Sequence, residues 1–190
     1  MNDTQTIFII TTISLWVIVT VYWIISSNTI SSANHRGKEL FSFLKLIGSS
    51  LIIYFPLLTG GLISTSLFQT SLTSGLTGLT FCILGIAIMV WARQHLGKNW
   101  SGNVTIQQGH TISRSGPYEY VRHPIYSGGL LAMCGSAIVL GQIFGFIWVL
   151  FCAFGLTMKI KQEENLLTKQ FPDEYPLYKK QVKKLIPFIW

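Results

Sequence analysis

Two polar segments of this sequence carry the residue types that could do chemistry, and each adjoins a long apolar stretch. The first contains the adjacent cationic and imidazole side chains of Arg122 and His123. The second begins at Lys159 and contains the neighbouring carboxylates Glu163 and Glu164. Arginine, lysine and histidine can hold an anionic group, and carboxylates accept hydrogen bonds from hydroxyl and ammonium groups. We therefore expect the functional polar residues to be concentrated in these two segments.

The composition around these segments is that of an all-α integral membrane protein. The 190 residues are 49% hydrophobic and only 11% charged, with a mean hydropathy of +0.47, whereas a soluble domain has about 25% charged residues. The net charge of +7 comes from basic residues between and after apolar runs. Such residues set topology and attract anionic lipid, so they do not indicate nucleic-acid binding. The three cysteines lie inside apolar runs without metal-ligand spacing.

The apolar stretches predict about five transmembrane helices in one membrane domain, residues 1–190. A transmembrane helix needs about 20 mostly apolar residues, and Pro56 predicts a kink in the second one. Only Gly141 and Gln142 separate the last two stretches, which predicts a helical hairpin. The predicted spans are about 6–25, 41–62, 72–91, 127–140 and 143–158.

The distribution of charge predicts the orientation in the membrane. Lysine and arginine are concentrated in the first loop, in the connector 94–126 and in the tail after Lys159. By the positive-inside rule, the N-terminus lies outside, and the connector and C-terminus lie in the cytoplasm. No acidic residue occurs between Glu39 and Glu119. Ion-coupled transporters place ionisable groups within their spans, so this gap disfavours a transporter.

Several short motifs follow one another in the second half of the chain. RHPxYxG begins at Arg122, EExxL begins at Glu163, and FxxxYxxY ends at Tyr178. Together, from about Gln94 onward, these motifs resemble the isoprenylcysteine carboxyl methyltransferase family, which is related to the phospholipid methyltransferases. The resemblance implies a membrane methyltransferase that uses S-adenosylmethionine, releases S-adenosylhomocysteine, and acts on a lipidic or prenylated substrate.

The resemblance also implies a set of site residues and no metal. Lys159 and Glu163 are the expected catalytic residues. Family members commonly carry an arginine four residues before this glutamate, thought to orient the substrate carboxylate, and Lys159 keeps the charge but lacks the bidentate fork. Either Lys159 holds that carboxylate less precisely, or the substrate is not a prenylcysteine. The expected cofactor-binding residues are His110, Thr111, Ile112, Gly116, Tyr118, Arg122, His123, Tyr126 and Glu163.

Structural explanations compete with these roles. Arg122 could be an interfacial anchor and Tyr126 a member of the aromatic belt. Gly128 could serve close packing between the two arms of the hairpin. Glu163 and Glu164 point about 100° apart on a helix, so both can scarcely face one pocket equally. The family resemblance favours Glu163 as the cofactor or active-site group. A solvated amphipathic helix would explain the pair equally well.

The sequence thus predicts a methyltransferase that O-methylates the carboxylate of an isoprenylcysteine-like or other lipidic substrate. One alternative is a phospholipid or amine N-methyltransferase. An alternative of another class is a non-catalytic small membrane transporter or assembly protein. A sterol-reductase-like enzyme is disfavoured because such chains are usually much longer. The expected partners are the substrate and membrane lipids, and the sequence gives no indication of the oligomeric state.

Overall fold

The regular structure of this chain is helical, as the composition predicts. The computed structural model describes residues 3–27, 44, 47–59, 65–97 and 112–190. Within these residues there are no β-strands, only two isolated bridges between residue pairs. The described helices are α1 (Asp3–Ser27), α3 (Pro56–Thr59), α4 (Leu72–Leu96), η3 (Gly116–Glu119), α5 (Pro124–Leu140), α6 (Ile143–Gln170) and α7 (Glu174–Gln181).

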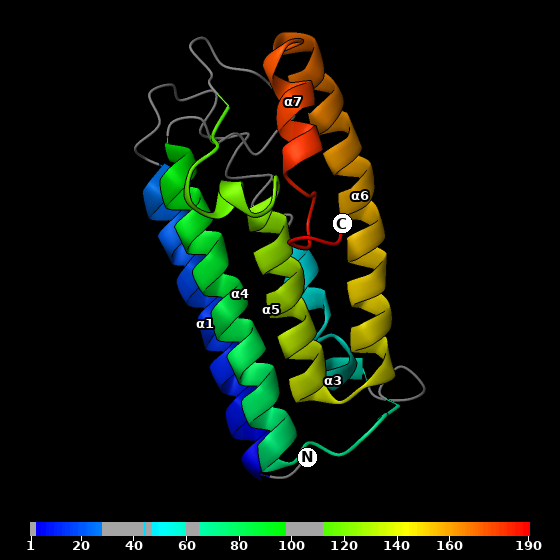
Figure 1. Cartoon of the computed structure of the whole chain (residues 1–190). Coiled ribbons are helices and arrows are strands. Elements are labelled where there is room, and N and C mark those ends of the chain that lie inside the picture. The colour runs from blue at the N-terminus through cyan, green and yellow to red at the C-terminus, as the bar shows by residue number, and fades with distance from the viewer. Residues whose placement is uncertain (1–2, 28–43, 45–46, 60–64, 98–111) are drawn as a thin grey trace.

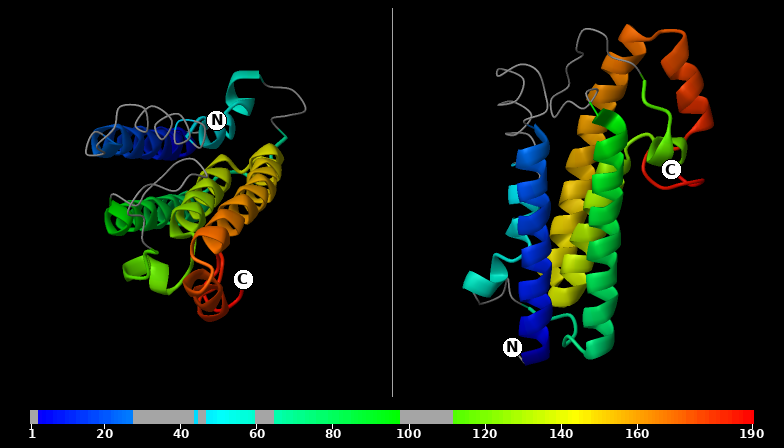
Figure 2. Two further views of the ribbon diagram at one scale, coloured as in Figure 1. Left: turned by 90° about the horizontal axis from the view of Figure 1, so that it is seen from above. Right: turned by 90° about the vertical axis from the view of Figure 1, so that its left-hand side faces the viewer.

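Three of the described helices, α1, α4 and α6, are long and apolar enough to cross a membrane, and α5 is a shorter apolar helix. The chain is therefore an all-α integral membrane protein. α1 and α4 run in one direction, α5 returns, and α6 runs back beside it (Figure 1). The right-hand view in Figure 2 shows the same long helices from another side, with α7 folded back at one end of the bundle. The amino end of α5 and the charged end of α6 are therefore at the same end of the bundle.

The helices extend beyond the predicted apolar spans. α4 continues through Arg93 to Leu96, α5 begins at Pro124, and α6 continues to Gln170, so each of these helices is longer than the apolar span predicted within it. Proline is favoured in the first turn of a helix. Lysine, glutamine, glutamate and leucine are good helix formers. The charged tail therefore prolongs α6 without a break, because hydropathy marks where a segment stops being apolar and not where the helix ends.

The second predicted span is interrupted. Residues 47–52 are helical, residues 53–55 form a turn, and α3 begins at Pro56. Proline has no backbone N–H and disfavours the helical conformation in the residue before it. The described part of the predicted span 41–62 is thus two helical pieces rather than one kinked helix. The remainder of that span lies outside the described residues.

Closely spaced glycines join α4 to α5. A Cβ atom on Gly78 would lie 2.6 Å from the carbonyl oxygen of Gly135, and one on Gly128 would lie 2.5 Å from that of Gly85. Glycine therefore lets the two backbones touch, as small residues do between transmembrane helices. The prediction that Gly128 serves close helix packing is confirmed. Its partner is α4, however, and not the other arm of the hairpin.

The hairpin between α5 and α6 is present as predicted. Gly141 ends α5 with φ 64° and ψ 19°, a left-handed conformation that glycine adopts without steric strain. Its carbonyl oxygen accepts a hydrogen bond from the backbone N–H of Leu67 at 2.7 Å. The turn is therefore tied to the segment before α4, at the end of the bundle opposite to the charged part of α6 (Figure 1).

Candidate functional site

The polar residues that could do chemistry meet where three segments converge. These segments are the start of α5, the charged part of α6 and the chain from α7 to residue 185. His123 caps α5 with φ −126°, and Pro124 begins the helix. The backbone N–H groups of Arg122 and His123 donate to the carbonyl oxygens of Lys183 and Lys184, at 2.8 and 3.1 Å. The arginine and histidine are thus fixed from behind by the C-terminal segment.

Glu164 is the most enclosed carboxylate of the site, with 5% of its surface exposed. Arg122 donates to its Oε1 from Nε at 2.9 Å and from Nη2 at 2.7 Å. Lys179 Nζ lies 3.1 Å from Oε2, and His123 Nε2 lies 3.3 Å from Oε1. Burial acts to raise the pKa of Glu164, but hydrogen bonds from His123, Arg122 and Lys179 lower it to about 2. Glu164 lies in the charged part of α6, beyond the apolar residues 143–158, and is ionised at neutral pH.

Arg122 joins all three segments. Besides Glu164, its guanidinium donates to the carbonyl oxygen of Lys179 at 3.3 Å and, at shorter range, to that of Val182. Its side chain is only 7% exposed. A buried guanidinium with this many acceptors holds a fixed position. Arg122 is therefore a structural centre of the site and not an anchor that reaches out to lipid headgroups.

Glu163 forms a second, more open group of contacts beside the first. Tyr126 donates from its hydroxyl to Glu163 Oε1 at 2.6 Å. Lys159 Nζ lies 3.9 Å from the same oxygen and 5.3 Å from the centre of the Tyr126 ring. The Tyr126 ring also stacks on His123, with 5.7 Å between ring centres. The structure thus brings together Lys159, Glu163, Tyr126 and His123, all expected site residues.

Both adjacent carboxylates reach His123, which corrects the expectation that only Glu163 faces the site. Nδ1 lies 3.6 Å from Glu163 Oε2, and Nε2 lies 3.3 Å from Glu164 Oε1. The two ring nitrogens point in different directions, so the imidazole spans the angle between the two side chains. Sequence reasoning missed Glu164 and its second cation, Lys179. The available signal was the excess of cations over carboxylates in these segments.

The described part of the connector lies against the end of α4. Gly116 has a φ of 60°, and a Cβ there would lie 2.5 Å from His95 Nε2. Tyr118 is buried, and its carbonyl oxygen accepts from the hydroxyl of Tyr178 at 2.6 Å. Burial raises the pKa of Tyr118, and it raises that of Tyr178 to about 12. Gly116 and Tyr118, two of the expected cofactor residues, therefore lie in η3 beside α4, and the hydroxyls of Tyr118 and Tyr178 stay protonated at neutral pH.

Of the three other expected connector residues, the structure describes only Ile112. Ile112 lies in the irregular segment before η3 and is partly buried. His110 and Thr111 lie outside the described residues.

Two more buried polar residues near the site were not among the predicted site residues, although Tyr175 belongs to the FxxxYxxY motif. Tyr175 is 2% exposed, and its hydroxyl has no hydrogen-bond partner among the described residues. Burial, followed by the charge of Glu164, raises the pKa of that hydroxyl. Arg93 is 4% exposed and donates to the carbonyl oxygens of Gly97 and Ser26, at 3.0 and 3.2 Å. Arg93 follows an apolar run directly, which is a weak signal for a buried cation.

Several known proteins are similar to this chain. A protein-S-isoprenylcysteine O-methyltransferase of Schizosaccharomyces pombe is 33% identical over 129 residues, which cover 65% of this chain and 51% of that protein. The Homo sapiens protein of the same name is 31% identical over 116 residues, covering 60% of this chain and 41% of that protein. A 3-oxo-5-alpha-steroid 4-dehydrogenase 1 of Rattus norvegicus is 31% identical over 114 residues, covering 60% and 41%. The chain spans about half the length, or less, of these relatives.

A family model also matches the part of the chain that builds the site. The match covers residues 78–169, which contain most of α4, the connector, α5 and nearly all of α6. It therefore includes Arg122, His123, Tyr126 and both carboxylates of the cluster. This match and these relatives support membership of the chain in the isoprenylcysteine carboxyl methyltransferase family.

Proposed function

We propose that this protein is an S-adenosylmethionine-dependent membrane methyltransferase that methylates the carboxylate of an isoprenylcysteine-like or other lipidic substrate. The observation that carries this proposal is the paired cluster of Glu163 and Glu164 around His123, at the polar end of apolar helices. At such a position the apolar tail of a substrate can remain in the bilayer while its polar end lies beside the charged cluster. Similarity to proteins named protein-S-isoprenylcysteine O-methyltransferase supports the same reaction.

The described residues fit the chemistry of the cofactor. S-adenosylmethionine, when bound, supplies an activated methyl group together with an ammonium group, a carboxylate and a ribose diol. Glu163 has acceptor capacity for hydroxyl or ammonium donors, because its side chain is partly exposed at 16%. The Tyr175 hydroxyl is buried without a hydrogen-bond partner in the described part of the chain. We assign Glu163, His123, Tyr126 and Tyr175 to holding the cofactor, together with the connector residues His110, Thr111, Ile112, Gly116 and Tyr118.

Arg122 supports this site from behind rather than at its surface. Its guanidinium is enclosed by Glu164 and by two carbonyl oxygens of the C-terminal segment. We infer that Arg122 positions His123 and the two carboxylates for cofactor binding.

Lys159 is suited to the substrate carboxylate. It stands one helical turn before Glu163, and its side chain is 33% exposed. A carboxylate acceptor is already ionised at neutral pH, so no general base is needed. The protein then has to position the two reactants and exclude water. Lys159 would orient the acceptor carboxylate through its positive charge. Tyr126 and Glu163 would hold the ammonium group of Lys159 in place.

Calorimetry with S-adenosylhomocysteine tests the cofactor, and transfer of a labelled methyl group to a farnesylcysteine analogue tests the reaction. We expect binding, and a label that base releases as it does from an ester. Glu163→Gln should lower methyl transfer by about 100-fold, because it misplaces the reactants. Glu174→Gln is the matched control, because Glu174 is exposed and contacts Arg114. No binding by well-folded protein would refute the proposal.

The substrate class has a separate test in Lys159→Arg. Arginine restores the bidentate fork, so kcat/KM should rise for a prenylcysteine carboxylate if that is the natural acceptor. Total membrane lipid, run in parallel, reveals methylation of amine headgroups as a base-stable label. A lower kcat/KM of Lys159→Arg for the prenylcysteine carboxylate, together with a base-stable label in membrane lipid, would assign the alternative N-methyltransferase activity.

We also propose that the N-terminus faces the outside and that the connector and C-terminus face the cytoplasm. The basic segments around the site support this orientation through the positive-inside rule. Cysteines introduced at Asp3 and at Lys169 should react with a membrane-impermeant maleimide from opposite sides. Labelling of Lys169→Cys from outside intact cells would reverse the assignment.

The similarity to a 3-oxo-5-alpha-steroid 4-dehydrogenase supports one alternative reaction. An oxidoreductase of that kind needs a redox cofactor that carries a hydride. Incubation with a 3-oxo steroid and a reduced nicotinamide cofactor tests it directly. Turnover in this assay, without binding of S-adenosylhomocysteine, would favour the dehydrogenase.

A further inference from the structure

A pocket on the outer surface of α6 is separate from the contacts of Glu163. Its volume is about 480 Å³, within the range of roughly 300–1,000 Å³ of small-molecule sites. Its walls come from α6, from α7 and from the C-terminal segment. The lining residues are Phe154, Thr157, Met158, Lys161, Glu164, Asn165, Lys179 and Lys184.

One end of this pocket is apolar and faces outward. Phe154 and Met158 are 68% and 55% exposed, and they belong to the apolar part of α6 that is long enough to cross a membrane. Lys161 follows on the same face, about 10 Å further along the axis than Phe154 at 1.5 Å per residue. The pocket therefore changes from apolar to charged along the direction in which α6 leaves the bilayer.

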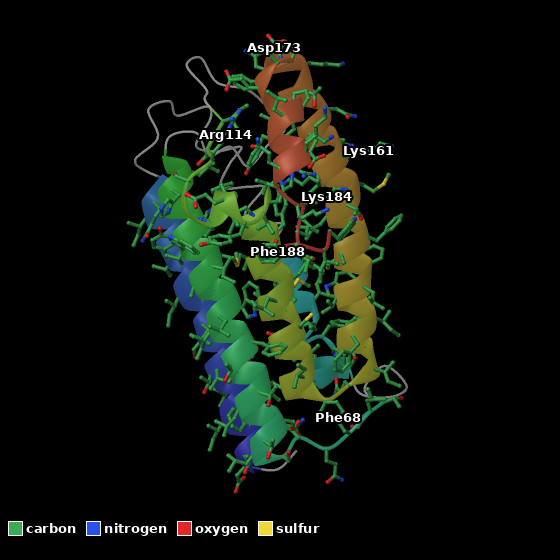
Figure 3. The ribbon with its side chains drawn as sticks, viewed as in Figure 1. Phe68, Arg114, Lys161, Asp173, Lys184 and Phe188 are labelled. Atoms are coloured by element: carbon green, nitrogen blue, oxygen red, sulfur yellow. The ribbon has the colours of Figure 1, made fainter. Side chains whose placement is uncertain are left out.

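The charged end of the pocket carries an excess of cations. Lys161, Lys179 and Lys184 line it together with one carboxylate, Glu164. That carboxylate is paired with Arg122 at 2.7 Å and with Lys179 at 3.1 Å, so the excess positive charge of the lining comes from Lys161 and Lys184. Figure 3 labels Lys161 on α6 and Lys184 on the C-terminal segment, at the same end of the molecule. An anion placed between these lysines would be attracted from two sides.

The C-terminal segment beside the pocket is suited to a membrane surface. Phe188 and Ile189 are 87% and 74% exposed, and Figure 3 labels Phe188 on this segment. Lys184 Nζ lies 5.1 Å from the centre of the Trp190 ring. Apolar and aromatic side chains next to lysines are typical of segments that lie in the interface of an anionic bilayer.

We propose that this pocket binds an anionic phospholipid of the surrounding bilayer. Lys161, Lys184 and Lys179 hold its phosphate, and its acyl chains lie along Phe154 and Met158. A soluble phosphate would leave the apolar end uncovered, whereas a lipid satisfies both ends in the order in which the bilayer presents them. The pocket shares Glu164 and Lys179 with the charged cluster, but the proposed lipid binding requires neither cofactor nor methyl acceptor.

Two double variants with equal charge change test the proposal. Lys161→Gln with Lys184→Gln removes two pocket cations, and Lys169→Gln with Lys180→Gln removes two exposed lysines of α6 and α7 outside the pocket lining. Native mass spectrometry of detergent-purified protein, titrated with phosphatidylglycerol or phosphatidylcholine, measures the bound lipid. We expect the pocket variant to bind phosphatidylglycerol about tenfold or more weakly, and the control to match the parent protein.

Three results would overturn the proposal. Equal losses in both double variants would indicate diffuse charge attraction only, and equal binding of the two lipids would remove the headgroup preference. Displacement of the lipid by soluble glycerol phosphate would indicate a phosphate site without acyl contacts. Thermal unfolding of each variant checks the fold, and Lys161→Gln alone, on the exposed face of α6, serves if the pocket variant is unstable. Binding of S-adenosylhomocysteine by the same samples is an independent measurement, so failure of either proposal can be distinguished.

Discussion

α5 makes two very different contacts along its length. Toward α4 it presents Gly128 and Gly135, so backbone meets backbone. At its amino end, Arg122 and His123 meet the carboxylates of α6 through charged side chains. Transmembrane helices associate through close packing because lipid gives no hydrophobic drive, whereas a buried ion pair requires every partner. The glycine contact between α4 and α5 is therefore disrupted when a side-chain atom is added. The ion-pair contact between the start of α5 and α6 is disrupted when one of its charged groups is removed.

The largest effect is expected from Arg122→Ala. This variant leaves buried Glu164 without its two shortest hydrogen bonds and should lower the free energy of unfolding by about 3–5 kcal/mol. Arg114→Ala is the matched control, because the Arg114–Glu174 pair is exposed and should contribute less than about 1 kcal/mol. Denaturant unfolding in detergent measures both. Similar losses in the two variants would show that burial does not distinguish these pairs.

The glycine contact is tested by adding one methyl group. Gly128→Ala should lower the free energy of unfolding by about 1–3 kcal/mol, because the added Cβ would lie 2.5 Å from Gly85 O and 3.0 Å from Met89 N. Gly155→Ala on α6 has no atom within 4 Å of the added Cβ and should stabilise the helix by up to about 1 kcal/mol. Thermal unfolding in detergent compares them. Effects of the same sign would contradict the structure.

An effect smaller than that of Arg122→Ala, and comparable to that of Gly128→Ala, is expected from Tyr126→Phe. It removes the 2.6 Å hydrogen bond to Glu163 and should lower the free energy of unfolding by about 1.5–3 kcal/mol, as for bonds to charged groups. Affinity for S-adenosylhomocysteine, measured by calorimetry, should fall as well because Glu163 loses its orientation. Unchanged affinity together with reduced stability would limit Tyr126 to a structural role.

The smallest effect on stability is expected from Tyr175→Phe. Its hydroxyl has no hydrogen-bond partner among the described residues, so removing it should not reduce the free energy of unfolding. If that hydroxyl binds the cofactor, the same variant should weaken binding of S-adenosylhomocysteine. Loss of stability without loss of binding would exclude Tyr175 from the cofactor site.

Hydropathy predicted α1, α4, α5 and α6, and the hairpin at Gly141, because long apolar runs and a two-residue gap are local signals. It did not predict how far helices continue in polar sequence, so α6 beyond 158 was taken for a tail. The glycines on α4 and α5 were visible in the sequence. Their pairing depends on which helices are neighbours, which no local pattern encodes.

In the site, too, the residues that local motifs indicate were predicted, and the contacts that depend on tertiary neighbours were not. Motif order indicated Arg122, His123, Tyr126 and Glu163, and the structure places them together. Glu164 was not predicted because the resemblance favoured Glu163 and two adjacent helical residues point in different directions. The two ring nitrogens of His123 nevertheless allow both carboxylates to contact it. Lys179 was missed because its contact depends on how α7 folds back onto α6.

The backbone hydrogen bonds between the start of α5 and the C-terminal segment have a consequence for biogenesis. The N–H groups of Arg122 and His123 donate to Lys183 and Lys184, and the hydroxyl of Ser127 donates to Leu185. Of the described segments that build the cluster, residues 182–185 are translated last. Synthesis of α5 and α6 is therefore finished before the segment that holds the start of α5 has been made. The charged cluster is completed only when residues 182–185 reach α5, so its closure is a later step than synthesis of the helices that carry it.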